Sequence, residues 1–200
     1  MIVIMKKEIV IATKNKGKVK EFKEMLEPYG YEVYSLLDFS DIGEIEETGS
    51  TFIENATIKA TTASKMLNKI CIADDSGLEI SALNNMPGIY SSRWLGEDTP
   101  YKEKIAYVIN ELKDKEDRTC RFVCAIVIAD ADNIITSFEE TCEGTIAYEM
   151  KGDNGFGYDP CFYYEPYGKT LAELSPQEKN EISHRGKAIK KLKGWLDENS

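Results

Sequence analysis

An apolar run that ends in two adjacent acids places the strongest constraint on how this chain can fold. Residues 70–73, Ile-Cys-Ile-Ala, have the length and β-branched content of a buried strand, and Asp-Asp-Ser-Gly follows at 74–77. Carboxylates at the end of a buried strand are costly to desolvate, so they need a cation or strong donors nearby. We therefore expect a loop here, which forms either a metal and catalytic centre or an acidic turn bonded to its own backbone.

Strands and helices are expected to alternate in the first half of the chain. A strand is predicted at 8–12, followed by a helix at 19–26 whose apolar residues have helical spacing. A second strand at 31–36 precedes a helix at 51–67 that opens with a capping box. Another short strand is expected at 78–83, after the Asp-Asp-Ser-Gly loop.

The second half is predicted to be a meander of strands with helices beside it. The expected elements are a helix after Thr99-Pro100 to about 113, a hairpin of 121–129 and 134–142, strands at 145–148 and 161–164, a glycine-rich loop at 152–157, a short helix capped by Ser175, and a last helix at 186–196. Alternation followed by a meander favours one α/β unit with a mixed sheet.

Charge and cysteine usage exclude several classes of protein. A formal net charge of −10 argues against nonspecific binding to nucleic acids or anionic membranes, although a local basic pocket can still hold an anion. His184 is the only histidine, which rules out a zinc site built from several histidines. The five cysteines include no Cys-x-x-Cys pair, so we expect reduced core residues of an intracellular protein.

Neither a signal peptide nor a membrane span is expected. The apolar start at 1–5 is too short for a signal-peptide core, and no later segment is apolar for long enough to cross a bilayer. We therefore expect a cytoplasmic protein without membrane partners, whose first residue is either Met1 or Met5.

Three basic or glycine-rich segments have the composition of phosphate-binding sites. Residues 13–18, Thr-Lys-Asn-Lys-Gly-Lys, lie between a strand and a helix N-terminus, where backbone N–H groups attract anions. In 152–158, glycines permit close approach, and Phe156 or Tyr158 can stack on a base. Residues 179–185 bring basic side chains to a helix junction. Each has a simpler interpretation: a solvated basic turn, a connecting loop, or a helix face in solvent.

A phosphatase of the haloacid dehalogenase type is a second enzymatic interpretation. Residues 125–132 form a strand followed by Asp-x-Asp, with Asp130 in the place of the nucleophile. That chemistry requires a small loop that enters a helix after the second acid. Residues 134–138 instead have the pattern of a returning hairpin strand.

Six short motifs occur in the order found in inosine triphosphate pyrophosphatases, also called dITP/XTP pyrophosphatases, which this chain resembles. They are Thr-Lys-Asn-Lys-Gly-Lys at 13–18, Glu-Glu-Thr-Gly at 46–49, Ala-Asp-Asp-Ser-Gly at 73–77, Met-Pro-Gly-Ile-Tyr at 86–90, Gly-Phe-Gly-Tyr-Asp at 155–159 and Ser-His-Arg at 183–185. The resemblance implies Mg²⁺-dependent hydrolysis of ITP, dITP and XTP to the monophosphate and pyrophosphate. It also implies a homodimer and one α/β domain over 1–200, in which helices flank an elongated, twisted mixed sheet and two lobes surround a central nucleotide-binding cleft.

The resemblance also implies roles for individual residues. Glu46 and Asp75 would bind Mg²⁺, and Asp75 would accept the proton of the attacking water. Ser76 would contact the substrate. The triphosphate would be held by Thr13, Lys14, Asn15, Lys16, Gly17 and Lys18, and the rest of the nucleotide, especially its base, by Phe156, Gly157, Tyr158, Asp159, Lys179, His184 and Arg185.

The chemistry of these residue types agrees with such roles. Mg²⁺ prefers a few carboxylates together with phosphate oxygens and water, so acids facing a lysine loop suit a magnesium nucleotide. A 6-oxo purine requires donors at its O6 edge, which His184, Arg185 and backbone N–H groups can supply. The 6-amino group of adenine would leave those donors unpaired. A module that binds purine nucleotides without turnover is the non-enzymatic alternative, although it has no need of an acidic metal cluster.

Overall fold

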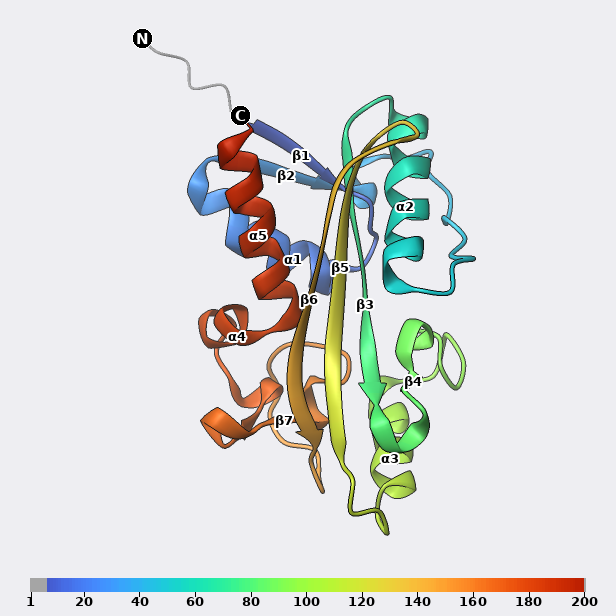
Figure 1. Ribbon diagram of the computed structural model, residues 1–200, viewed down its shortest axis with the longest axis vertical. Coiled ribbons are helices and arrows are strands. Elements are labelled where there is room, and N and C mark those ends of the chain that lie inside the picture. The colour runs from blue at the N-terminus through green and yellow to red at the C-terminus, as the bar shows by residue number, and fades with distance from the viewer. Residues whose placement is uncertain (1–6, 200) are drawn as a thin grey trace. The chain divides into compact units, whose positions relative to one another are not determined.

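The computed structural model, which describes residues 7–199, contains one mixed sheet with helices beside it (Figure 1). The strand order is β2-β1-β3-β5-β6-β7-β8, and β4 pairs with β3 off this path. The strands are β1 Lys7–Ile11, β2 Tyr31–Ser35, β3 Cys71–Ile80, β4 Met86–Pro87, β5 Thr119–Asp130, β6 Asn133–Ile146, β7 Phe162–Tyr164 and β8 Lys169–Thr170. The helices are α1 Lys16–Leu26, α2 Phe52–Leu67, α3 Tyr101–Glu111, α4 Pro176–Ile182 and α5 His184–Glu198.

Parallel and antiparallel pairs occur in the same sheet. The first strand, β1, is parallel to both β2 and β3, while β7 is antiparallel to both of its neighbours, β6 and β8. The α/β class with a mixed sheet is therefore confirmed. The short apolar start at 1–5 lies outside the described residues, and no helix within 7–199 is long and apolar enough to cross a membrane.

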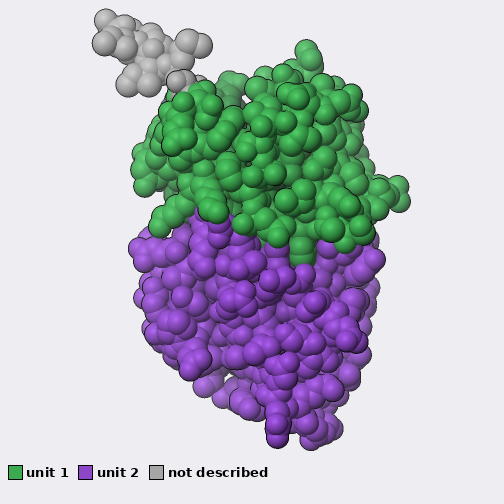
Figure 2. Space-filling view, viewed as in Figure 1, with its two compact units in different colours: residues 1–75, 124–139, 188–200 green, residues 76–123, 140–187 purple. Residues whose placement is uncertain are grey.

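The chain divides into two compact units, which Figure 2 shows in different colours. Unit 1 comprises 1–75, 124–139 and 188–200, and unit 2 comprises 76–123 and 140–187. The strands β3, β5 and β6 and the helix α5 contribute residues to both units.

Unit 1 is a three-layer arrangement with helices on both faces of its strands (Figure 1). On one face, α1 and the larger part of α5 pack against β1, β2 and β3, and their buried side chains form one apolar cluster that includes Ile11, Phe22, Leu26, Ile72, Ile126, Ile189 and Leu192. On the other face, α2 buries a stripe of small residues, among them Ala56, Ala60 and Ala63. This burial is the main source of stability for the elements that carry the candidate site.

Unit 2 has its own apolar core. Side chains of α3 pack with those of β5, β6 and β7, and the cluster includes Leu78, Ile105, Val108, Leu112, Phe122, Cys142, Ile146, Tyr158 and Phe162. All five cysteines of the chain are buried and none forms a disulfide, as the reduced-core interpretation predicted.

One prediction near the centre of the chain was wrong. The Asp-Asp-Ser-Gly segment at 74–77 is not a loop between two strands, because β3 runs without interruption from Cys71 to Ile80. Asp, Ser and Gly are typical of turns, but these residues lie in the middle of the sheet, where ladder hydrogen bonds and buried neighbours outweigh that local preference.

Other helix boundaries in the structure differ from the predicted ones by a few residues. The helix expected at 19–26 begins at Lys16, and the last helix begins at His184 instead of Gly186. Pro100 precedes α3 as its cap without a side-chain bond, so the expected cap by Thr99 was wrong. The capping box of Ser175 with Glu178 at α4 is confirmed. The two-residue strand β8 was not predicted.

The hairpin interpretation of the region after Asp130 is confirmed. Strands β5 and β6 are joined by the two residues Ala131 and Asp132, and Ile134 to Phe138 belong to the return strand. No helix follows the second acid, so this segment lacks the geometry that the dehalogenase-type alternative requires.

Candidate active site

The two acids of β3 project to opposite faces of the sheet. Successive side chains alternate along a strand, so Asp74 shares its face with Ile72, which packs against α1 and α5. Asp74 is fully buried, and its Oδ2 lies 3.1 Å from Nζ of Lys18 in the first turn of α1. Asp75 is 5% exposed and faces α2. Its Oδ1 lies 3.6 Å from Nζ of Lys59.

Lys59 is the central cation of the group around Asp75. It lies in the buried stripe of α2 and is 8% exposed. Its ammonium group donates to the backbone oxygen of Asp74 at 2.6 Å and lies 3.0 Å from Oε1 of Glu47. Lys59 therefore contacts Asp75, the strand that carries it, and the neighbouring acidic segment.

Burial and charge shift the proton affinities of this pair. Burial raises the pKa of Asp75 to about 6, and the positive charges of Lys59 and Lys18 only partly oppose this effect. Burial alone would lower the pKa of Lys59, but the charges of Asp75, Asp74 and Glu47 raise it above its ordinary value. Lys59 is thus held as a cation beside a carboxylate of unusually high proton affinity.

The loop at 13–18 is shaped by its own side chains. Thr13 Oγ1 accepts a hydrogen bond from the backbone N–H of Asn15 at 3.1 Å. Asn15 caps α1, and its Oδ1 accepts from the backbone N–H of Lys18 at 3.1 Å. A capped helix N-terminus next to two or more ammonium groups is a favourable place for phosphate oxygens.

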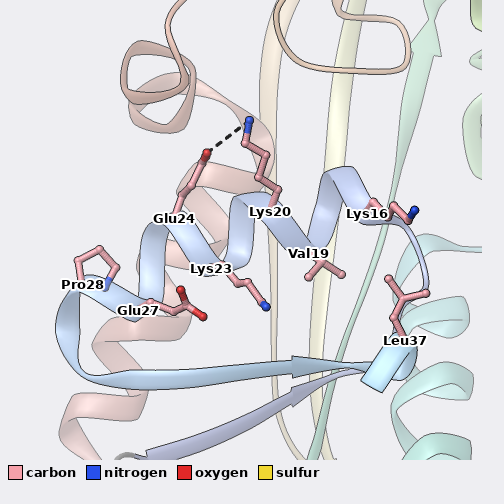
Figure 3. Close-up of a pocket in the computed structure, with 8 residues that line it drawn as sticks. All are labelled: Lys16, Val19, Lys20, Lys23, Glu24, Glu27, Pro28 and Leu37. Atoms are coloured by element: carbon pink, nitrogen blue, oxygen red, sulfur yellow. Dashed lines mark ion pairs between the residues drawn. The ribbon is translucent and has the colours of Figure 1, made fainter. Parts of the chain in front are cut away.

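The three lysines of this loop have different surroundings. Lys14 donates to the backbone oxygen of Ile42 at 2.7 Å, and Lys18 pairs with Asp74. Lys16 lines a pocket beside α1 together with Lys20, Lys23 and Leu37, as Figure 3 shows. Of the three ammonium groups, that of Lys18 is therefore the one in contact with the buried acids.

The acidic segment before α2 is fixed to that helix. Asn55 is fully buried, and its Oδ1 accepts a hydrogen bond from the N–H of Gly49 at 2.8 Å. A Cβ at Gly49 would lie 2.7 Å from Asn55 Oδ1, so a side chain there would prevent this approach. Of the two acids just before this anchor, Glu46 is exposed, whereas Glu47 is half-buried against Lys59.

One buried oxygen in this group suits an external ligand. Oδ2 of Asp75 is buried and has no hydrogen-bond partner among the described residues. A buried acceptor without a partner is costly, and a cation or a water molecule would satisfy it. No group of three or more His, Cys, Asp or Glu side chains within 7–199 is arranged to hold a metal ion. A metal here would take few protein ligands and complete its shell with water or substrate, as Mg²⁺ commonly does.

A second group of predicted site residues lies in unit 2 and includes Arg185 and Ser76. Arg185 is 3% exposed, and its Nη2 donates to Oγ of Ser76 at 2.6 Å. The guanidinium carbon also lies 5.5 Å from the ring centre of Phe156. Phe156 is half-buried, so part of its ring is available for stacking.

Asp159 holds the glycine-rich loop in place. Its Oδ2 accepts from Nζ of Lys179 at 2.7 Å and from the N–H of Phe156 at 3.0 Å. Gly155 has a positive φ, and a Cβ there would lie 2.2 Å from Asp159 Oδ2, so glycine is required at this position. Lys179 also lies 4.9 Å from the ring centre of Phe156. The Phe156 ring is thus bordered by two cations.

Tyr158 and His184 are buried more deeply than Phe156. The hydroxyl of Tyr158 donates to the backbone oxygen of Ser91 at 2.7 Å, and its ring packs edge-on against Tyr101. Of the two aromatic residues in this loop, Phe156 is therefore the better placed for stacking. His184 is 4% exposed and stacks on Phe122.

Two residues that contact the acids were not among the site residues predicted from the sequence: Lys59 and Glu47. A signal for Lys59 was present, because it interrupts the apolar stripe formed by Phe52, Ala56, Ala60 and Ala63 at helical spacing. A lysine on the buried face of a helix requires an anionic partner.

Comparison with known proteins identifies relatives over nearly the whole chain. The model of the Ham1 family matches residues 9–195. A "dITP/XTP pyrophosphatase" from Bacillus licheniformis is 52% identical over 194 residues, which cover 96% of this chain and 99% of the relative.

Solved structures of similar chains have the same fold. A Ham1 protein from Staphylococcus aureus is 45% identical, with a TM-score of 0.85 over 97% of this chain and 100% of that one. A HAM1 protein from Coxiella burnetii is 44% identical, with a TM-score of 0.87 over 96% of this chain and 99% of that one.

Proposed function

The chain belongs to the Ham1 family, and we propose that it hydrolyses non-standard purine nucleoside triphosphates to the monophosphate and pyrophosphate. The substrate class is that of the dITP/XTP pyrophosphatases to which the chain is about half identical. The family resemblance inferred from the six motifs is confirmed by these matches.

The observation that carries the catalytic proposal is the environment of Asp75. Its Oδ2 is buried without a hydrogen-bond partner among the described residues, while its Oδ1 is close to Lys59. Such a carboxylate can accept a hydrogen bond from a water molecule and then a proton. Because burial raises its pKa to about 6, it accepts a proton more readily than an ordinary aspartate does.

The reaction then follows from Asp75 and the neighbouring cations. A water oxygen attacks the α-phosphorus while Asp75 accepts one of its protons. The bond between the α-phosphorus and the bridging oxygen breaks, and that oxygen leaves with its electron pair as part of pyrophosphate. Lys18 and the N-terminus of α1 attract the phosphate oxygens. Thr13 and Asn15 maintain the conformation of the loop that precedes this helix.

The same residues suit Mg²⁺ as a cofactor. We propose that Asp75 supplies a carboxylate ligand and that Glu46, which is exposed near the anchored Gly49, supplies a second, directly or through water. When bound, Mg²⁺ neutralises charge on the phosphate oxygens and on the leaving pyrophosphate.

The unit 2 group supplies the chemistry for binding the base. Phe156 offers part of an aromatic face, and the Arg185 guanidinium beside it is a donor for the 6-oxo edge of a purine. A ring N–H of His184 is a second donor. Lys179 and Asp159 hold the loop that carries Phe156. A 6-amino group would oppose these donors with its own, which disfavours ATP.

The proposed function is tested by supplying ITP, dITP, XTP, GTP and ATP in turn and measuring both pyrophosphate and orthophosphate. With Mg²⁺, we expect pyrophosphate from the first three and little from ATP, and EDTA should stop the reaction.

We expect Asp75→Asn to lower kcat by about 10²–10⁴-fold. Its matched control, Asp130→Asn, changes an exposed acid at the hairpin and should have no effect. Orthophosphate as the first product, or loss of activity in Asp130→Asn, would favour the dehalogenase-type alternative instead. Binding of ITP without turnover would favour a sensor module.

We also propose that the protein is a homodimer. Exposed apolar side chains of unit 2, with Tyr90 at 45%, Leu95 at 44% and Tyr107 at 42%, are candidates for the buried surface. Sedimentation at several concentrations checks this, and a single species with the mass of one chain would contradict it.

A further inference from the structure

Three aromatic rings from distant parts of the chain form a continuous stack in unit 2. Phe122 on β5 lies between Phe162 on β7 and His184, the first residue of α5. The centroids of Phe122 and Phe162 are 4.5 Å apart at 15°, and those of Phe122 and His184 are 4.6 Å apart at 19°. None of the three residues is more than 6% exposed.

The far end of the stack is fixed by the sheet. Phe162 pairs with Ile146 in the β6–β7 ladder. Gly144, two residues earlier on β6, leaves the space that the Phe162 ring occupies, because a Cβ there would lie 2.5 Å from Phe162 Cε1. Phe162 therefore has little freedom to move away from Phe122, and the stack has a rigid support.

The backbone at the other end is fixed independently. Ser183 Oγ accepts from the N–H of Gly186 at 3.0 Å and so caps the first turn of α5. A Cβ at Gly186 would lie 1.9 Å from the backbone oxygen of Asn180, so the junction of α4 and α5 is closely packed. These contacts place the Cα of His184, and because the outer torsion of histidine is broad, the orientation of its ring depends on side-chain contacts.

We propose that Phe122 is a positioning residue for purine recognition, which sets the plane of the His184 ring through the stack that Phe162 supports. The inference rests on the proposed function, because it assigns to His184 a contact with the base. A ring N–H bonds well only when it points at its acceptor, and misalignment weakens the bond steeply. Phe122 touches no substrate and acts only through His184.

A single histidine makes the stack directly observable. In protein without a histidine tag, His184 gives the only imidazole proton resonances, and the faces of Phe122 shield them by ring current. Phe122→Leu should move these resonances downfield. It should also lower kcat/KM for ITP on the order of tenfold, by misplacing a recognition group, while leaving kcat/KM for ATP unchanged. Phe122→Tyr keeps a ring in place and should retain both the resonances and the preference for ITP.

The matched control is Phe138→Leu, a half-buried phenylalanine that packs against the core of unit 1. It should alter neither readout. Thermal unfolding establishes that each variant is folded, and if Phe122→Leu does not fold, Phe122→Met takes its place because it retains more of the volume.

Two outcomes would overturn the inference while leaving the proposed function intact. One is a variant without the Phe122 ring whose imidazole resonances do not move. The other is a variant whose resonances move although its ITP-to-ATP ratio of kcat/KM equals that of the wild type or of Phe138→Leu. An unaltered protein that releases no pyrophosphate from ITP would contradict the proposed function, and the inference with it.

Discussion

Asp75 combines deep burial with an incomplete set of partners. Its ordinary pKa of 3.8 is raised to about 6, mainly by burial. For an acid with a raised pKa, the contribution to stability is present at low pH and is lost as the pH rises through about 6. At neutral pH, where Asp75 is ionised, the protein thus bears an energetic cost that a catalytic base explains.

This shift predicts how activity depends on pH. As the pH falls through about 6, Asp75 takes up a proton and can no longer accept one, so kcat/KM for ITP should fall tenfold per pH unit below that value. The profile of kcat/KM reports the free enzyme and is measured at a low Mg²⁺ concentration, because a divalent cation bound to Asp75 would lower its pKa and move this limb to lower pH. The terminal phosphate of the substrate titrates nearby. Assignment of the limb to Asp75 therefore requires that it also respond to loss of the positive charge of Lys59. A rate that stays level down to pH 4.5 would contradict the account.

Sequence reasoning named Asp75, Ser76 and Arg185, the partner of Ser76, as candidate site residues, but it did not name Lys59 beside Asp75. Lysines on helices usually face solvent, and the sequence alone does not show that Lys59 lies inside the α2 interface. The contrast among Lys14, Lys16 and Lys18 was equally hidden, because it depends on where the side chains end and not on residue type.

At the scale of elements, the predictions succeeded where the signals were local. The capping box of Ser175 and the turn at 131–132 are read from neighbouring residues, and both are present. The interior of β3 was mistaken for a loop because its extended conformation depends on the neighbouring strand β5 and on the partners of its acids, Lys18 and Lys59, on two helices. The continuous strand has a functional consequence, since alternation sends Asp74 toward Lys18 and Asp75 toward Lys59.

Removing the charge on α2 tests this arrangement. Lys59→Met leaves Asp75 and Glu47 without their shared cation, so we expect unfolding to become easier by about 3 kcal/mol. Because Lys59 lowers the pKa of Asp75, the acid limb of kcat/KM should move to higher pH in this variant. Denaturant unfolding and the pH profile of the variant measure the two effects.

The matched control is Lys65→Met on the same helix. Lys65 is exposed and pairs with Asp132 at the surface, so its loss should change stability by no more than about 0.5 kcal/mol and leave the pH profile in place. A pH limb that does not move in Lys59→Met would remove Asp75 from the assignment of that limb.

At the scale of the whole molecule, the candidate residues form two groups in different units. The acids and the lysine loop belong to unit 1, and the residues proposed to bind the base belong to unit 2. Asp75 and Ser76 are consecutive residues of β3 and belong to different groups. The motif order predicted which residues belong to the family pattern, but not this division. The cleft expected between two lobes stays a prediction.

In the proposed reaction water attacks the α-phosphorus, and hydrolysis of ITP in water enriched in ¹⁸O distinguishes this attack from attack at the β- or γ-phosphorus. Attack at the α-phosphorus places the label in the monophosphate, so mass spectrometry should find labelled IMP and unlabelled pyrophosphate. Label in pyrophosphate, or labelled orthophosphate as the first product, would show attack at another phosphorus and contradict the account.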